Sequence, residues 1–293
     1  MNLALTVLEI VAPVFLLAAI GFTWVKMGYE YRINFVTQLA MTLAVPCLIF
    51  TALMQTEIET SALSALSLAT VVAYLGITMI AGIGVWAFGL NRRTYLAPII
   101  FGNTGNLGLP LALFAYGDEG LGYAVVVFAI MAIWAFTFGI WLVAGAGSLV
   151  RVLREPLVAA TLLGGLFLWQ DWQTPRFITN TLELIGQMAI PLMLITLGVA
   201  VARLTPVGIG RAVVLSVMKL AVCVGIAWLA ASAFALDRVA FGVLALQLAT
   251  PVAVTSYLLA EKYGADAQAV AGLVVVSTVI SVGALPLLLA VLL

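Results

Sequence analysis

The chain has 293 residues, of which 65% are hydrophobic and 8% are charged, with 12 basic and 12 acidic side chains and no histidine. Soluble globular domains carry about 25% charged residues, so this composition excludes a soluble protein and indicates an integral membrane protein. Apolar runs of ~20 to 25 residues leave room for roughly ten spanning helices joined by short loops. We therefore expect a lipid bilayer around the chain and no nucleic-acid partner.

Charged residues and glycines divide the chain into ten predicted spanning segments. These segments are continuously apolar and lack the period-two alternation of outer-membrane strands, so the predicted fold class is an all-α polytopic membrane protein. We place the ten helices at residues 3–25, 32–55, 66–90, 94–116, 121–148, 156–172, 178–202, 207–235, 238–261 and 266–293. The first segment carries Glu9 and lacks both a basic start and a small-residue cleavage site, which favours a span over a signal peptide.

Basic residues fall mostly on one side of the membrane when the ten helices are drawn in order. Only Arg176 and Arg238 fall on the other side. The majority group consists of Lys26, Arg32, Arg92, Arg93, Arg151, Arg154, Arg203, Arg211 and Lys262. Because cytoplasmic loops carry the excess of Lys and Arg, we expect both termini on the outer side of a bacterial inner membrane.

The two halves of the chain repeat one another. The stretch "AVPCLIFTAL" around Pro46 is matched by "AIPLMLITLG" around Pro191, and we expect a hinge of the scaffold at each proline. Five spans per half is an odd number, so the second half should be inverted relative to the first, as in many secondary transporters. The predicted repeats are residues 1–148 and 149–293.

A second matched pair lies in the fourth and ninth predicted helices. Pro110 in "NTGNLGLP" follows Asn106 by four residues, and Pro251 in "QLATP" follows Gln247 by four. Each proline removes a backbone donor and frees the carbonyl four residues earlier, and both of those residues also carry side-chain amides. We predict that helices 4 and 9 are broken at this point and cross near the middle of the bilayer.

Irregular backbone at that depth is tolerated where it is buried in protein or lines a cavity, so the sequence predicts a substrate site at the crossing. The alternative is that the glycines and prolines only kink packed helices. The predicted substrate-binding residues are Asn103, Thr104, Asn106, Gly108, Pro110, Gln247, Thr250, Pro251 and Thr255.

Lys219 lies near the middle of the eighth predicted helix, where a cation costs at least ~2.5 kcal/mol on insertion scales. One interpretation is that it occupies the place of a coupling sodium ion, stabilising carbonyls at the crossing or changing protonation during transport, which a lysine can do and an arginine cannot. A second is that it neutralises a substrate carboxylate. A third is that backbone carbonyls of the bundle satisfy the ammonium and it has no further role.

Four stretches resemble the auxin efflux carrier family: "FGNTGNLGLPLALFAYG" (101–117), "PCLIF" (46–50), "IPLMLITLG" (190–198) and "LQLATPVAVTSYLLAEKYGAD" (246–266). The resemblance covers essentially the whole chain. It implies a fold similar to bile acid sodium symporters, with predicted helices 1, 2, 6 and 7 as a scaffold and helices 3–5 and 8–10 as a transport domain. It also implies an elevator motion, small organic anions such as auxin-like or malate-like carboxylates as substrates, and a homodimer.

Enzymatic functions find no support in the sequence. It has no metal motif, no phosphate-binding loop and no Gly-x-Ser-x-Gly elbow. We therefore expect a secondary active transporter that uses no cofactor and is coupled to H⁺ or Na⁺. The alternative from another class is an anion channel or a membrane sensor, although a channel favours a pore shared by several subunits.

Overall fold

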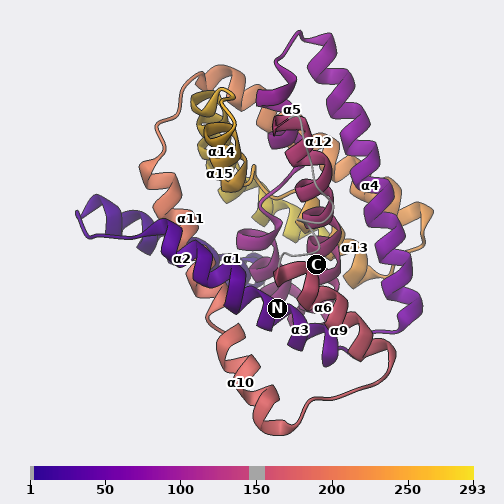
Figure 1. Cartoon of the computed structure of the whole chain (residues 1–293). Helices are drawn as coiled ribbons and strands as arrows, with labels where there is room; N and C mark the ends of the chain where they lie inside the picture. The colour runs from indigo at the N-terminus through magenta and orange to yellow at the C-terminus, as the bar shows by residue number, and fades with distance from the viewer. Residues whose placement is uncertain (1–2, 145–155) are drawn as a thin grey trace.

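The computed structural model describes residues 3–144 and 156–293 (Figure 1). Every named element in these two ranges is helical, which confirms the predicted all-α class. Arg151, Arg154 and the predicted boundary between the repeats at residues 148 and 149 lie outside the described residues.

The first described range contains seven α-helices and π-helical turns, labelled η. They are α1 (Leu3–Lys26), α2 (Ile33–Leu39), η1 (Ala40–Ala44), α3 (Val45–Met54), α4 (Thr60–Ala87), α5 (Arg92–Ile100), η2 (Thr104–Gly108), α6 (Leu109–Trp134), η3 (Ala135–Gly139) and α7 (Ile140–Ala144). The second range contains α9 (Pro156–Trp169), α10 (Arg176–Gly186), α11 (Ala189–Arg203), α12 (Ile209–Ala233), α13 (Arg238–Leu248), α14 (Val254–Lys262) and α15 (Ala267–Leu292).

Within the described ranges, seven helical stretches are long and apolar enough to cross a membrane. The longest, Thr104–Val143, contains Gly117 at φ 66° and ψ −153°, so two helices meet there. The helices α9 and α13 are apolar but shorter. The membrane-spanning character is therefore confirmed, whereas the predicted count of ten spans stays a prediction.

One group of helices packs around α1, α3 and α11. The helix α1 lies along α11, and α3 packs against α9 and α10. Gly198 allows the closest approach, because a methyl group on it would overlap the backbone carbonyl of Ala18. Gly186, at the end of α10, lies close to the backbone of Leu48 in α3, where an added methyl group would make a tight contact at 3.1 Å. In Figure 1 α1, α2, α10 and α11 occupy the left and lower part of the molecule.

A second group contains α4–α7 and α12–α15. The helix α12 packs against α4, α13 and α15, and α13 packs against α6; α4 lies at the right edge of Figure 1. Large apolar side chains point outward from α4, including Leu68, Met79, Ile83 and Trp86. Such an apolar exterior fits contact with lipid, and the polar residues of this group are buried in its centre.

Candidate functional site

Two segments in the second group lack helical structure and lie deep in the protein. The helix α5 ends at Ile100 and helical structure resumes at Thr104; α13 ends at Leu248 and α14 begins at Val254. We call residues 101–103 the first interruption and residues 249–253 the second interruption. Side-chain caps start the helices that lead into them, because Asn91 accepts from two amides at the start of α5 and Asp237 accepts from one at the start of α13.

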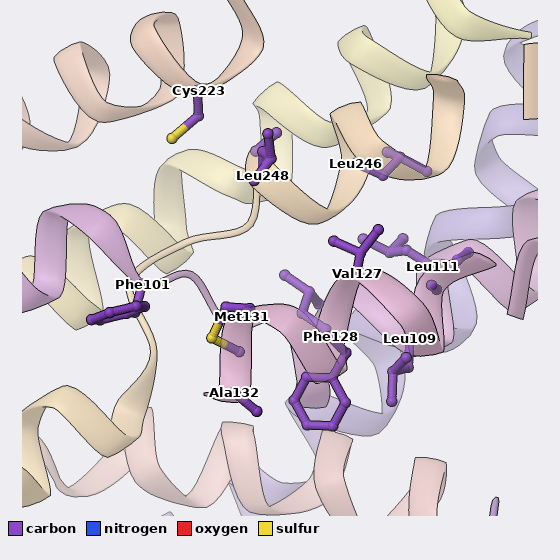
Figure 2. Packing of buried hydrophobic residues seen from close by; sticks show 14 of the residues in the cluster. Phe101, Leu109, Leu111, Val127, Phe128, Met131, Ala132, Cys223, Leu246 and Leu248 are labelled. Atoms are coloured by element: carbon purple, nitrogen blue, oxygen red, sulfur yellow. The ribbon is translucent and has the colours of Figure 1, made fainter. Parts of the chain in front are cut away.

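The two interruptions pair with each other in antiparallel fashion. The amide of Asn103 donates to the carbonyl of Pro251 at 2.7 Å, and the amide of Ala253 donates to Phe101 at 3.5 Å. Gly102 faces Val252 between these bonds. Buried backbone groups must find partners, and here each broken helix supplies them to the other. Figure 2 shows Phe101 at the end of one helix and Leu248 at the end of the other.

Two glycines allow this close approach. A methyl group on Gly102 would overlap the hydroxyl of Thr250, and one on Gly108 would overlap the side-chain amide of Gln247. Gly108 was among the predicted site residues, and the structure places it directly against Gln247. Gly102 was not predicted, because its importance depends on a residue almost 150 positions later in the chain.

Side chains from α12 and α15 hold the second interruption from behind. Lys219 on α12 is 5% exposed, and its Nζ donates to the carbonyl of Thr250 at 2.9 Å. Ser277 on α15 accepts from the amide of Val252 at 3.0 Å. The Thr250 hydroxyl donates to the carbonyl of Gln247 at 2.7 Å. The carbonyl that receives the ammonium lies two residues beyond the end of α13, close to the negative end of that helix dipole.

Three of the predicted site residues carry buried polar atoms without a hydrogen-bond partner among the described residues: Asn103 Nδ2, Thr104 Oγ1 and Gln247 Oε1. The other amide atom of Gln247 donates to Ala124 at 3.4 Å. An unpaired polar group costs roughly 1–3 kcal/mol in a protein interior. Several such atoms around one pair of interruptions are therefore typical of a site that binds a polar ligand.

The remaining predicted site residues are placed differently. Asn106 lies in η2, is half-buried and makes no side-chain hydrogen bond within the described residues. Thr255, at the start of α14, is exposed and lies apart from the buried polar atoms. Pro251 lies within the second interruption, but Pro110 is the second residue of α6, beyond the first interruption. The first break thus precedes the position that the proline rule indicated.

The π-helical turn η2 explains this difference. The amides of Leu107 and Gly108 both donate to the carbonyl of Asn103, at 3.1 and 3.2 Å. This wider turn runs directly into α6, so Pro110 lies inside a continuous helical segment that begins at Thr104, and the helix does not break at the proline. The matched spacing of amide and proline in the two halves therefore does not mark the same structural position.

The ends of four helices meet around the interruptions, and their dipoles favour a negative ligand on one side. The continuous segment of η2 and α6 begins at Thr104, and α14 begins at Val254. Helix N-termini present free backbone donors and a partial positive charge, and they bind anions readily. The carbonyl ends of α5 and α13 are occupied instead, by the paired backbone and by Lys219.

A cavity of about 640 Å³ opens between the two groups of helices. It lies where α3 and α10 face the start of the helix that follows Gly117. Polar residues line most of it: Thr51, Gln55, Thr56, Glu57, Asp118, Glu119, Glu183 and Gln187. Gln55 Nε2 donates to Glu183 Oε1 at 2.6 Å. No local sequence pattern groups these residues, because they come from α3, the linker after it, the kink at Gly117 and α10.

The two predicted hinge prolines both lie where a helix changes. Pro46 is the second residue of α3, immediately after the π-helical turn η1. Pro191 is the third residue of α11, after the turn at Gln187 and Met188 that separates this helix from α10. Pro191 lies in the first turn of α11, where a proline loses no internal hydrogen bond, whereas Pro46 lies inside the helical stretch Ile33–Met54.

Long apolar helices surround the buried polar residues of the two interruptions. This arrangement is typical of an integral membrane protein, and the buried polar residues suit a small polar solute. The profile of the membrane transport protein family matches residues 6–152 and, a second time, residues 143–289. The chain belongs to this family, which confirms the resemblance to auxin efflux carriers. The double match also supports the division of the chain into two repeats.

Two archaeal proteins are similar over nearly the full length. An uncharacterized transporter of Methanothermobacter thermautotrophicus is 27% identical over 296 residues, which cover 95% of this chain and 96% of that protein. An uncharacterized transporter of Methanocaldococcus jannaschii is 22% identical over 299 residues, covering 94% and 95%. The family is one of transporters, in agreement with the expectation that the chain is not an enzyme.

Proposed function

We propose that the protein is a secondary active transporter that moves small organic anions, such as carboxylates, across the cytoplasmic membrane. The observation that carries this proposal is the cluster of unpartnered buried atoms on Asn103, Thr104 and Gln247 at the paired interruptions. Asn103 Nδ2 and the Thr104 hydroxyl can donate to carboxylate oxygens, whereas Gln247 Oε1 accepts and suits a hydroxyl or protonated group of the same ligand. The adjacent helix starts at Thr104 and Val254 add partial positive charge.

We propose an elevator motion, which the grouping of the helices supports. In this proposal α1–α3 and α9–α11 form the scaffold, and α4–α7 and α12–α15 form the transport domain that carries both interruptions. Each group packs mainly within itself, and the 640 Å³ cavity lies at their boundary. Pro46 and Pro191 lie in the scaffold, in α3 and α11, and we propose that they act as its hinges.

The proposed architecture is two inverted five-helix repeats, with α5–α6 and α13–α14 as the crossing broken helices. It predicts that cysteines at Arg92 and Glu57 lie on opposite sides of the membrane. In intact cells a membrane-impermeant thiol reagent should label Glu57→Cys and leave Arg92→Cys protected. Labelling in the reverse pattern, or of both positions equally, would contradict the inverted repeat and the placement of the termini outside.

Counterflow in proteoliposomes tests the function directly. Vesicles loaded with an unlabelled carboxylate should accumulate the labelled form transiently, because a carrier exchanges substrates through one site and a channel does not. A panel of short dicarboxylates and aromatic monocarboxylates identifies the substrate by competition. Repeating the uptake with imposed pH or sodium gradients identifies the coupling ion. If no organic anion shows saturable uptake or counterflow, the proposed function is wrong.

A further inference from the structure

Two helix corners of the molecule share a sequence pattern and a backbone geometry. Residues 88–92 read "FGLNR" at the link from α4 to α5, and residues 234–238 read "FALDR" at the link from α12 to α13. The second residue of each has left-handed backbone, with φ 61° at Gly89 and 48° at Ala235. The amide of the following leucine bonds to the carbonyl five residues earlier, at 2.9 Å in the first corner and 3.0 Å in the second. An alanine adopts this backbone only at a cost, so the shared geometry is imposed by the fold.

An arginine beside each corner binds the end of another helix. Arg93 donates from Nε and Nη2 to the carbonyl of Val143 in α7, at 3.1 and 2.9 Å. Its Nη2 also donates at 3.0 Å to the carbonyl of Tyr263, the residue that caps α14. In the second corner, Arg238 Nη2 donates to the carbonyl of Leu293, the residue that caps α15. Carbonyl ends of helices carry partial negative charge and favour such cations.

A second pair of matched positions lies beside the corners. The sequence Tyr-Gly stands at residues 116–117 and 263–264, and the two glycines have φ 66° and 68°. The first corner reaches the later of these pairs through the arginine bond just described. The second corner lies beside the earlier pair, because a methyl group on Gly242, one turn beyond Arg238, would overlap the Tyr116 hydroxyl. Each arginine corner therefore lies next to the Tyr-Gly turn of the opposite half.

This pairing accounts for an arginine that departs from the charge asymmetry of the loops. In the proposed topology Arg238 is one of two basic residues on the outer side, where basic residues are disfavoured. An inverted repeat places equivalent positions on opposite faces of the membrane. The equivalent of a cytoplasmic arginine corner must then fall on the outer face.

We propose that Arg93 and Arg238 are matched positioning residues, one for each broken helix. Each fixes the start of a half-helix, α5 or α13, against the end of the last helix of its half, α7 or α15. Because α5 and α13 lead directly into the paired interruptions, a shift at the start of either half-helix would displace that pairing. The bonds themselves belong to the fold, whereas their consequence for transport rests on the proposed function.

Hydrogen exchange of the purified protein in detergent tests the bonds without a transport assay. Loss of a hydrogen bond favours local opening, so the amides of α5 and the end of α14 should exchange about two- to tenfold faster in Arg93→Gln. In Arg238→Gln the faster exchange should appear in α13 and at the end of α15. Arg92→Gln and Arg176→Gln, at exposed arginines on the same two faces in the proposed topology, are the matched controls. Exchange in either test variant equal to that of its control would overturn the proposal.

Transport kinetics distinguish a positioning role from a general loss of stability. Arg93→Gln should lower the maximal rate several-fold and leave the substrate concentration for half-saturation unchanged. Arg93→Lys should recover part of the rate, because it restores one charged donor. A change confined to half-saturation, or no recovery in the lysine variant, would contradict the positioning role. If the unmodified protein transports no organic anion, the proposed function is wrong, and the exchange measurement still decides whether the arginines hold the helix ends.

Discussion

The two interruptions face each other but are held in different ways. The second interruption is fixed from behind, because Lys219 donates to Thr250 and Ser277 accepts from Val252. The backbone of the first interruption bonds across to the second, through Phe101 and Asn103. The unpartnered atoms of Asn103 and Thr104 follow immediately after it.

This difference suggests that one interruption positions the backbone of the crossing and the other binds the substrate. The side of the crossing that carries the buried cation is bonded through its backbone to Lys219 and Ser277, so it provides a support. The other side takes its backbone geometry from that support and presents free polar side chains, joined by Gln247 from the end of α13. Preorganised polar groups bind a ligand without the cost of ordering them. We therefore expect substitutions at the support to act through geometry and substitutions at the free side chains to act through binding.

The largest effect is expected where the two interruptions touch. Gly102→Val would force a branched side chain into Thr250 and separate the paired backbone. Overpacking of this kind costs typically 1–3 kcal/mol, occasionally more, and here it also leaves backbone groups unpaired. The yield of monodisperse protein and its melting temperature should fall sharply. The matched control is Gly82→Val in α4, where an added methyl group meets no atom within 4 Å; equal behaviour of the two variants would contradict the tight pairing.

Removal of the cation comes next. Lys219→Met keeps the side-chain length but offers no donor, which leaves the Thr250 carbonyl buried and unpaired at a cost of roughly 1–3 kcal/mol. Transport should be abolished while protein remains in the membrane. Lys219→Arg keeps a charge that cannot be lost. Partial activity of this variant with an unchanged pH profile would indicate that the charge only holds the second interruption in place. Loss of both activity and pH dependence would indicate that Lys219 changes protonation during transport. Full activity of Lys219→Met would show that the support is dispensable.

A smaller effect on transport is expected at Ser277, whose hydroxyl accepts from the second interruption. Ser277→Ala leaves the amide of Val252 without its partner, but a water molecule can replace a hydroxyl more easily than an ammonium. We expect a reduction of maximal transport by about two- to fivefold, in proportion to ~0.5–1 kcal/mol, with little change in the substrate concentration for half-saturation. Ser67→Ala, which removes a hydroxyl that bonds only within α4, should have no effect. A loss confined to substrate affinity would instead place Ser277 on the recognition side.

Much of the fold could be predicted because bilayer chemistry restricts it. Continuous apolar runs allow only helices, and the repeated prolines revealed two halves. The number of continuous spans was harder to obtain, because the apolar stretch Thr104–Val143 runs through the kink at Gly117, where the predicted helices 94–116 and 121–148 meet. Turns of one or two residues inside an apolar run leave little trace in composition.

The site shows the same limit more clearly. Asn103, Thr104, Gln247 and Lys219 could be singled out from the sequence because polar groups in apolar helices are rare and costly; their role in binding stays a prediction. The exact position of the first break was missed, since the π-helical turn after Asn103 absorbs the effect of Pro110. Contacts between distant segments, such as that of Ser277 with Val252 or the acidic lining of the 640 Å³ cavity, depend on tertiary packing that no local pattern encodes.

Counterflow by amide variants tests the central claim, that the polar atoms at the paired interruptions bind the substrate. Gln247→Leu and Asn103→Leu retain bulk and remove donors and acceptors, and Gln38→Leu, at an exposed glutamine of α2, is the matched control. The assay uses the carboxylate of the panel that is transported best. The two site variants should lose at least about tenfold in transport efficiency, equivalent to ~1.4 kcal/mol. Their expression and melting temperature should stay normal, and the control should transport as the unmodified protein does. Unchanged kinetics in both site variants would contradict the account.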